Sequence, residues 1–312
     1  PDWILHAPQR VSCHGRNQYV LDFSRKEVVD CIYDMMYKIL SESKISYIKW
    51  DMNRSITECY SVALPADRQG EVFHRYILGV YDLYDRLTTA FPQILFESCA
   101  SGGGRFDPGM LYYAPQGWIS DDTDAAERVR IQYGTSMCYP ISSMGSHVSV
   151  VPNHQLNRIT SLHTRANVAY FGTFGYELDL NKLTDEEIAE VKAQIIFMKE
   201  YRELIQFGNF YRLKSPFDGN ETVWMTVSED KRKALVFWYR ERNVVNAEFT
   251  RVRLQGLDPD LIYKNEYNGT ENYGDELMNL GLLTTDVTAG EPTNEDLPCT
   301  DYESRIYVLT AE

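Results

Sequence analysis

The stretch YIKWDMNR, residues Tyr47–Arg54, joins a β-strand pattern to a polar loop. Together with the residues before it, the pattern predicts a strand over Ile45–Trp50. Because side chains alternate across a strand, Tyr47, Lys49 and Asp51 should share one face, and the two apolar residues between them the other. A buried strand that ends at an ionisable residue is typical of α/β proteins, whose reactive groups gather at the carboxyl ends of strands.

Strand and helix patterns alternate on both sides of this stretch. Upstream, Gln18–Phe23 is predicted as a strand, and Ser24 with Glu27 as a capping box that opens a helix through about residue 42. Downstream, further strands are expected at Ile94–Glu97, Gly117–Ser120, Ile141–Val150 and Ala169–Leu178. Helices are expected at Gly70–Thr89, from Asp124 toward Tyr133, at Asn153–Asn167, and after a capping box formed by Thr184 and Glu187.

The pattern changes beyond Gly208. There the sequence predicts strands without helices, at Thr222–Val227, Lys233–Tyr239, Ala247–Leu254 and Arg305–Leu309. Such alternation is typical of an antiparallel β-sandwich. We therefore expect residues 1–207 to be the (β/α) barrel portion of a catalytic domain and residues 208–312 to be a C-terminal antiparallel β-sandwich.

About six βα steps, without a Rossmann or P-loop motif, favour an α/β fold of the (β/α)8 TIM-barrel type. A closed barrel needs eight strands to remove its edges. The sequence is thus expected to lack the first strands of the barrel and to begin inside it.

Composition restricts the partners. The chain has 31 basic and 45 acidic residues and a formal charge of −14, which disfavours nucleic acid. No stretch reaches the roughly 18 apolar residues of a membrane helix. The six cysteines are irregularly spaced, which disfavours a disulfide scaffold or a zinc site, and we predict no metal and no cofactor. The lack of a signal peptide leads us to expect a cytoplasmic protein.

Two carboxylates follow predicted strands. Asp51 has Lys49 two residues before it on the same face, so the lysine could keep a nucleophilic carboxylate ionised, or the two could form an ordinary ion pair. Asp121 lies in the segment WISDDTD, where repulsion among Asp121, Asp122 and Asp124 could raise the pKa of a proton donor. Asp122 and Asp124 could equally cap the next helix, and local reasoning does not choose among the three.

Other combinations are weaker. The segment CASGGGR (Cys99–Arg105) allows close backbone approach to a ligand, but it lacks the strand–GxGxxG–helix context of a dinucleotide site. Ser120 and His147 could be drawn into a hydrolase triad, yet no GxSxG elbow supports one. We therefore set both aside.

Taken together, the chain resembles glycoside hydrolase family 36, the bacterial α-galactosidases. The segments that carry the resemblance are PDWIL (Pro1–Leu5), GRNQYVLDFSRKEV (Gly15–Val28), YIKWDMNR (Tyr47–Arg54), FESCASGGGRFDPGMLYYAPQ (Phe96–Gln116), WISDDTDAAERVRIQYGTSMCYP (Trp118–Pro140), SSMGSHVS (Ser142–Ser149) and YGDELMNLGL (Tyr273–Leu282).

The resemblance implies a role for each matching residue. Asp51 would be the nucleophile and Asp121 the general acid/base. The residues implied to bind the sugar or the nucleophile, or to line the pocket, are Arg16, Lys49, Asn53, Cys99, Gly102 and Trp118, with Cys99 and Gly102 near the 2-hydroxyl. In a retaining enzyme the two carboxyl groups should lie about 5–5.5 Å apart.

The resemblance also implies an activity, which is retaining hydrolysis of terminal α-galactosyl residues from melibiose- and raffinose-type oligosaccharides. A galactosyltransferase of the raffinose-synthase type would use the same aspartates, with a sugar hydroxyl in place of water. If the upstream strands are absent, a non-catalytic carbohydrate-binding fragment is a third interpretation. Family members form homo-oligomers, commonly tetramers, through regions partly missing here.

Overall fold

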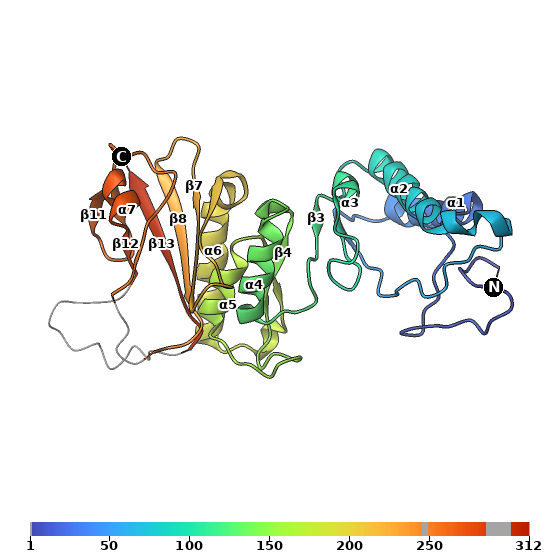
Figure 1. Cartoon of the computed structure of the whole chain (residues 1–312), viewed down its shortest axis with the longest axis horizontal. Helices are drawn as coiled ribbons and strands as arrows, with labels where there is room; N and C mark the ends of the chain where they lie inside the picture. The colour runs from blue at the N-terminus through green and yellow to red at the C-terminus, as the bar shows by residue number, and fades with distance from the viewer. Residues whose placement is uncertain (1, 245–248, 285–300, 312) are drawn as a thin grey trace. The chain divides into compact units, whose positions relative to one another are not determined.

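A computed structural model describes residues 2–244, 249–284 and 301–311 of the chain. The chain folds into two compact units, which meet in sequence between Asp121 and Asp122 (Figure 1). The predicted alternation of strands and helices is confirmed through the first unit and the first part of the second.

The first unit is a parallel sheet, with one helix before its first strand and further helices between its strands. Its strands are β1 (Tyr47–Trp50), β2 (Leu95–Ser98) and β3 (Gln116–Gly117), in the order β1-β2-β3. The helices are α1 (Lys26–Glu42), α2 (Val72–Ala90) and α3 (Pro108–Tyr113), with a 3-10 segment η1 (Ala66–Glu71) before α2. Parallel pairing brings the carboxyl ends of the three strands to one edge.

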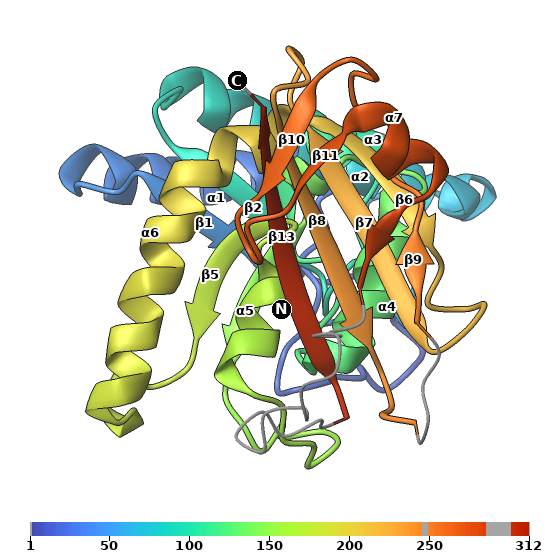
Figure 2. The ribbon, with the colours of Figure 1, turned by 90° about the vertical axis from the view of Figure 1, so that its left-hand side faces the viewer.

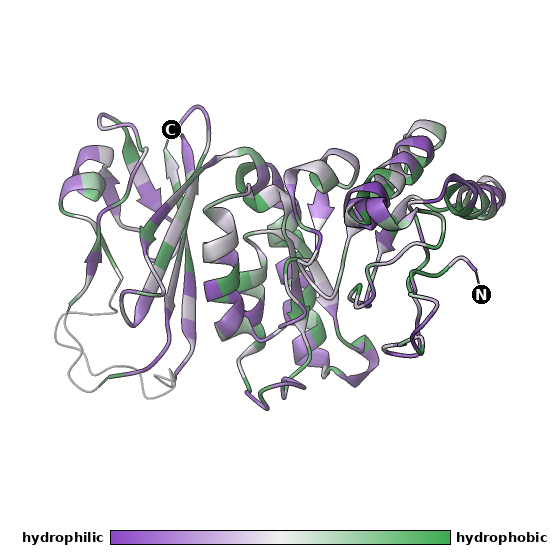
Figure 3. Ribbon diagram, turned by 45° about the vertical axis from the view of Figure 1, so that its right-hand side comes forward, coloured by the Kyte–Doolittle hydropathy of each residue, from purple (hydrophilic) through white to green (hydrophobic). Residues whose placement is uncertain are grey.

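The core of this unit lies between the sheet and helices α1 and α2. Tyr84 and Leu87 of α2 and Phe96 of β2 are completely buried, and Ile48 and Trp50 of β1 pack against the same cluster. Hydrophilic and hydrophobic residues both occur along α1 and α2, as amphipathic helices require (Figure 3). Packing on this side commits Ile48 and Trp50 to the core, so the alternate residues of β1 must face away from it.

The second unit begins with a shorter α/β segment. It contains α4 (Ala125–Ser136), β4 (Gly145–Ser149), α5 (Leu162–Ala169), β5 (Thr173–Glu177) and α6 (Asp185–Phe207), with 3-10 segments η2 (Ile141–Ser143) and η3 (Leu180–Lys182). Strands β4 and β5 pair in parallel. The capping box predicted at Thr184 and Glu187 is present at the start of α6.

An antiparallel sheet follows, in the order β11-β10-β13-β8-β7-β6 (Figure 2). Its strands are β6 (Asn209–Lys214), β7 (Glu221–Val227), β8 (Lys233–Arg240), β10 (Ile262–Asn265), β11 (Glu271–Tyr273) and β13 (Glu303–Ala311). A two-stranded pair, β9 (Arg251–Val252) with β12 (Leu282–Leu283), and a short helix, α7 (Gly274–Asn279), complete the described part.

The central strands β7 and β8 of this sheet are buried on both faces. Val236 and Trp238 of β8 belong to a cluster with Val252 of β9 and Leu277 of α7. On the opposite face of the same strand, the ring of Phe237 lies 5.8 Å from that of Phe171, which follows α5. Because both faces are covered, β7 and β8 carry nearly continuous apolar runs.

Several predicted elements were wrong. Gln18–Phe23 forms two isolated bridges, because Leu21 pairs singly with Ile4 and Gln18 closes a turn with Gly15. The predicted cap at Ser24 is absent, since its hydroxyl donates to Asp22 instead.

The helix predicted at Asn153–Asn167 begins only at Leu162, where Ser161 accepts a hydrogen bond from Thr164 N. Helix α7 interrupts a region that was expected to contain only strands. Of the strand predicted at Ala247–Leu254, only Arg251–Val252 is formed, and Ala247 and Glu248 lie outside the described residues.

The coarse fold class is confirmed, as an α/β region followed by an antiparallel sheet domain. Within the described residues, the parallel strands form a sheet of three and a sheet of two. The closed (β/α)8 barrel and the division at residue 207 stay predictions.

Candidate active site

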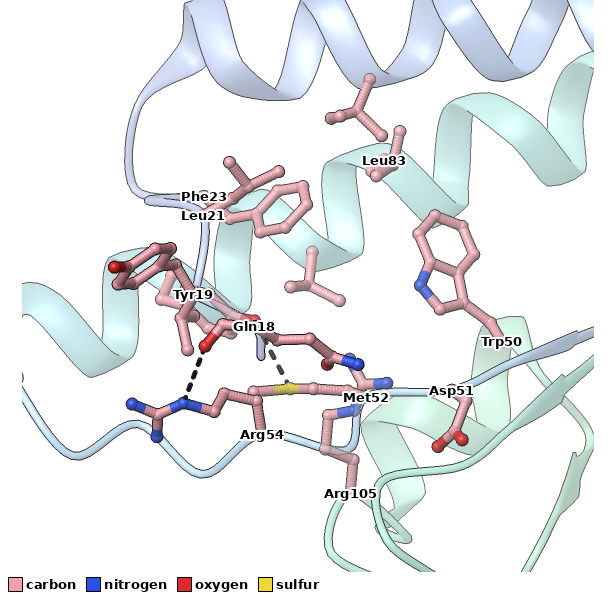
Figure 4. A pocket seen from close by; sticks show the side chains of 14 residues that line it. Gln18, Tyr19, Leu21, Phe23, Trp50, Asp51, Met52, Arg54, Leu83 and Arg105 are labelled. Carbon is pink, nitrogen blue, oxygen red and sulfur yellow. Dashed lines mark hydrogen bonds between the residues drawn. The ribbon is translucent and has the colours of Figure 1, made fainter. Parts of the chain in front are cut away.

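Asp51 follows β1 directly and lies on the face opposite the core. Figure 4 shows the Asp51 carboxylate and the Trp50 ring pointing in opposite directions from adjacent positions. Asn53 donates a hydrogen bond from its amide to the Asp51 carboxylate. Strand pairing extends beyond this point, because Met52 N donates to Cys99 O at 3.0 Å and so fixes the loop that carries Asp51.

Cys99 connects β2 to this carboxylate. The residue is 3% exposed, its thiol forms a hydrogen bond with Asp51, and Gly102 N–H donates to the sulfur. Burial is the main cause that raises the pKa of the Cys99 thiol to about 11, and the hydrogen bond to the Asp51 carboxylate adds to it. At neutral pH the thiol is therefore protonated and acts as a hydrogen-bond donor to Asp51.

Asp121 lies just beyond β3 at the same edge of the sheet. The indole Nε1 of the buried Trp118 donates to Asp121 Oδ1 at 3.1 Å. Gly102, at a φ of +80°, packs against the backbone beneath this carboxylate. A Cβ added at Gly102 would lie 2.8 Å from Ser120 Cα and 3.0 Å from Asp121 N. The glycine is required both by its left-handed backbone and by this close approach.

Lys49 contacts the neighbours of both carboxylates, Trp118 beside Asp121 and Cys99 beside Asp51. Its ammonium nitrogen is 4.5 Å from the centre of the Trp118 ring, a cation–π contact, and it acts electrostatically on the Cys99 thiol. Its ion-pair partner is Glu97, with Nζ and Oε1 3.6 Å apart. Neither of the two interpretations of Lys49 and Asp51 from the sequence included Glu97.

The first unit thus brings together Lys49, Asp51, Asn53, Cys99, Gly102, Trp118 and Asp121, seven of the eight residues singled out from the sequence. Arg16 stands apart. It occupies a turn between Gly15 and Gln18 at a φ of +52°, is exposed, and its side chain forms no hydrogen bond or ion pair with another described residue. The separation of the two carboxyl groups stays a prediction.

Glu97 is the member of this cluster that sequence reasoning missed. The sequence predicts Glu97 only as the last residue of the strand Ile94–Glu97. One signal in the sequence could have identified it. Glu97 is an ionisable residue at the end of an apolar run, and it lies two positions before Cys99, which places both side chains on one face of the strand.

The other two aspartates of the WISDDTD segment have structural partners in the second unit. Asp124 caps α4 by accepting from Ala126 N and Glu127 N, which confirms the capping interpretation. Asp122 accepts from Asp124 N at 3.0 Å and so shapes the turn before the helix. His147, considered for a triad, pairs with Glu177 at 3.2 Å.

A cavity of 260 Å³ lies on the core side of β1, and Asp51 is the only predicted site residue that lines it. Its walls are mainly apolar and include Leu21, Phe23, Trp50 and Leu83 (Figure 4). A sugar requires convergent polar groups. We therefore assign the candidate site to the polar face of β1.

The described residues contain neither a candidate metal cluster nor a helix suited to a membrane. Residues 2–244, 249–284 and 301–311 contain no group of three or more His, Cys, Asp or Glu side chains that could hold a metal ion. None of the helices in these ranges is long and apolar enough to span a bilayer. Cys13, Cys31, Cys59, Cys99 and Cys138 are free thiols, and Cys299 lies outside the described residues.

Parallel strands whose carboxyl ends collect two carboxylates, a lysine and a tryptophan place the chain among α/β proteins with a strand-end active site. Comparison with known proteins gives the family. The melibiase profile matches residues 1–208, and the profile of the glycosyl hydrolase family 36 C-terminal domain matches residues 221–309. The chain belongs to glycoside hydrolase family 36.

Two similar relatives are named as α-galactosidases. The chain is 55% identical to α-galactosidase AgaA of Geobacillus stearothermophilus and 53% identical to α-galactosidase Mel36A of Lactobacillus acidophilus, each over 90% of this chain and 38% of the relative. The crystal structure of AgaA superimposes with a TM-score of 0.93 at 52% identity, covering 100% of this chain and 42% of that one. The chain therefore spans well under half the length of these relatives.

Proposed function

We propose that this chain carries the catalytic residues of a retaining α-galactosidase that hydrolyses terminal α-galactosyl residues of melibiose- and raffinose-type oligosaccharides. The observation that supports this most directly is the chain of contacts that leads from Asp51 through Cys99, Lys49 and Trp118 to Asp121. A variant of AgaA has been crystallised in complex with raffinose, which supports the substrate class.

The reaction would proceed in two displacements. Asp51 attacks the anomeric carbon and forms a glycosyl ester, while Asp121 gives its proton to the departing glycosidic oxygen. The Asp121 carboxylate then takes a proton from water, whose oxygen attacks the same carbon and releases Asp51. Two inversions at one carbon restore the original configuration.

The neighbouring groups suit these roles. The amide of Asn53 and the thiol of Cys99 donate to Asp51 and can orient its attacking oxygen. The Trp118 indole donates to Asp121 and can fix the direction of its proton. Arg16, Lys49, Cys99 and Gly102 would complete the sugar contacts, with Cys99 and Gly102 near the 2-hydroxyl.

The architecture proposed with this function follows the sequence predictions. Residues 1–207 would be part of a (β/α)8 barrel, and residues 208–312 a β-sandwich built on the antiparallel sheet. The antiparallel order of β6, β7, β8, β13, β10 and β11 supports the second assignment. The protein would act as a homo-oligomer.

Azide rescue of two variants tests the assignment of the carboxylates. Without Asp51, azide can attack the substrate directly, so Asp51→Ala in the full-length protein should release β-galactosyl azide from an activated aryl α-galactoside. Without Asp121, azide should instead attack the glycosyl ester, so Asp121→Ala should release α-galactosyl azide.

Asp67→Ala, which removes an exposed carboxylate in η1, is the matched control and should behave as wild type. Wild-type activity in Asp51→Ala would exclude it as the nucleophile. The same azide anomer from both variants would exclude the division of roles.

A further inference from the structure

Glu97 is a buried charge below the candidate active site. Its side chain is 1% exposed, although it lies within β2 and faces the same side as Cys99. In the register of the sheet it stands opposite Lys49 of β1 and Gln116 of β3, so the three residues form one row across the strands. A buried carboxylate is costly unless donors and a cation compensate it, which makes its partners informative.

The two oxygens of this carboxylate have different partners. Tyr47, two residues before Lys49, donates its hydroxyl to Oε2, and Gln116 Nε2 donates to the same oxygen at 2.6 Å. These donors are neutral and hold the carboxylate in one orientation. Oε1 faces Lys49 Nζ at 3.6 Å. The buried charge is thus directed at the lysine.

Lys49 in turn reaches the next row of side chains. That row contains Cys99 and Trp118, each two residues beyond a member of the Glu97 row. The ammonium group lies over the Trp118 ring and acts on the Cys99 thiol. The Trp118 indole forms a hydrogen bond with Asp121, and the Cys99 thiol forms one with Asp51. Among the described residues, Lys49 forms an ion pair with Glu97 and none with Asp51.

We infer that Glu97 is a positioning residue, which holds the Lys49 ammonium over Trp118 and keeps it from pairing directly with the Asp51 carboxylate. This inference rests on the proposed function. A direct ion pair between Lys49 and Asp51 would make the Asp51 carboxylate a weaker nucleophile toward the anomeric carbon. Without the Glu97 charge, Coulomb attraction would draw the ammonium toward another carboxylate, and Asp51 is two residues away on the same face.

A double-mutant cycle on the full-length protein tests the inference. Glu97→Gln keeps an oxygen for the Tyr47 hydroxyl and removes the charge, and it should lower kcat/KM on an aryl α-galactoside by about tenfold or more. Lys49→Met removes the group on which Glu97 acts. In the double variant, Glu97→Gln should add less than about a twofold further loss, because its effect passes through Lys49.

A structural role predicts a different result. If Glu97 only supported the fold, its replacement would cost the same factor with and without Lys49, and this outcome would overturn the inference. An unchanged kcat/KM in Glu97→Gln would overturn it as well. Glu42→Gln, an exposed glutamate at the end of α1, is the matched control.

Folding and the proposed function are checked separately. If Glu97→Gln does not fold, Glu97→Asp keeps the charge but shortens its reach, and the same cycle applies. Failure of the proposed function would be recognised by wild-type activity in Asp51→Ala. Failure of this inference alone would be recognised by equal losses in the two backgrounds while Asp51→Ala remains inactive.

Discussion

Gly102→Ala should disturb Asp121 without touching any ionisable group. The added methyl would lie 2.8 Å from Ser120 Cα, whereas ordinary contact begins at 3.4 Å, so the backbone below the carboxylate must move by about 0.6 Å. The neighbour is backbone, so no flexible side chain can make room. The φ of +80° adds strain of roughly 1–2 kcal/mol for a residue with a Cβ.

The kinetic effect follows from the displacement. A misplacement near 1 Å can cost about 100-fold in rate, so we expect kcat/KM for a substrate with a poor leaving group to fall about 10–100-fold. This loss corresponds to about 1.4–2.7 kcal/mol of transition-state stabilisation. An activated dinitrophenyl leaving group departs without a proton, and because kcat/KM reports only the first displacement, that substrate should lose much less.

Gly70→Ala is the matched control, because a Cβ at Gly70 would have nothing within 4 Å. Both variants should be assayed in the full-length protein on a phenyl and a dinitrophenyl α-galactoside, with unfolding midpoints measured in parallel. Equal losses on both substrates, or a Gly102→Ala enzyme as active as Gly70→Ala, would refute the link between this glycine and Asp121.

Three further predictions concern single residues. The pKa of Cys99 is raised to about 11, so its thiolate forms only as the pH rises toward that value. Iodoacetamide at pH 8 should therefore label the exposed Cys13 and spare Cys99. Peptide mapping that finds Cys99 labelled first would contradict this. Thr184→Ala should cost about 1 kcal/mol by removing the cap of α6, whereas Thr184→Ser should not, as measured by hydrogen exchange in the first turn. Leu87→Ala should destabilise the first unit by about 2–5 kcal/mol, since Leu87 is fully buried, and an unchanged denaturation midpoint would argue against that packing.

Local sequence patterns predicted the structure correctly where the partners of a residue lie close to it in the chain. The alternation in YIKW correctly separated Ile48 and Trp50 from Tyr47 and Lys49. The capping box at Thr184 was also correct. The box predicted at Ser24 failed because Asp22, two residues earlier, offered its hydroxyl a stronger acceptor.

The sequence by itself determined the strand–helix order, the face on which Asp51 lies and, through its motifs, the family. Only the tertiary structure decided which charges meet. The partner of Lys49 is Glu97, which is 48 positions away in the chain, because parallel pairing of β1 with β2 sets them opposite each other. The tertiary structure also decided that Gly102 packs against the backbone of Asp121. Local sequence patterns do not show which backbone segments approach each other or which residues of two strands stand opposite each other.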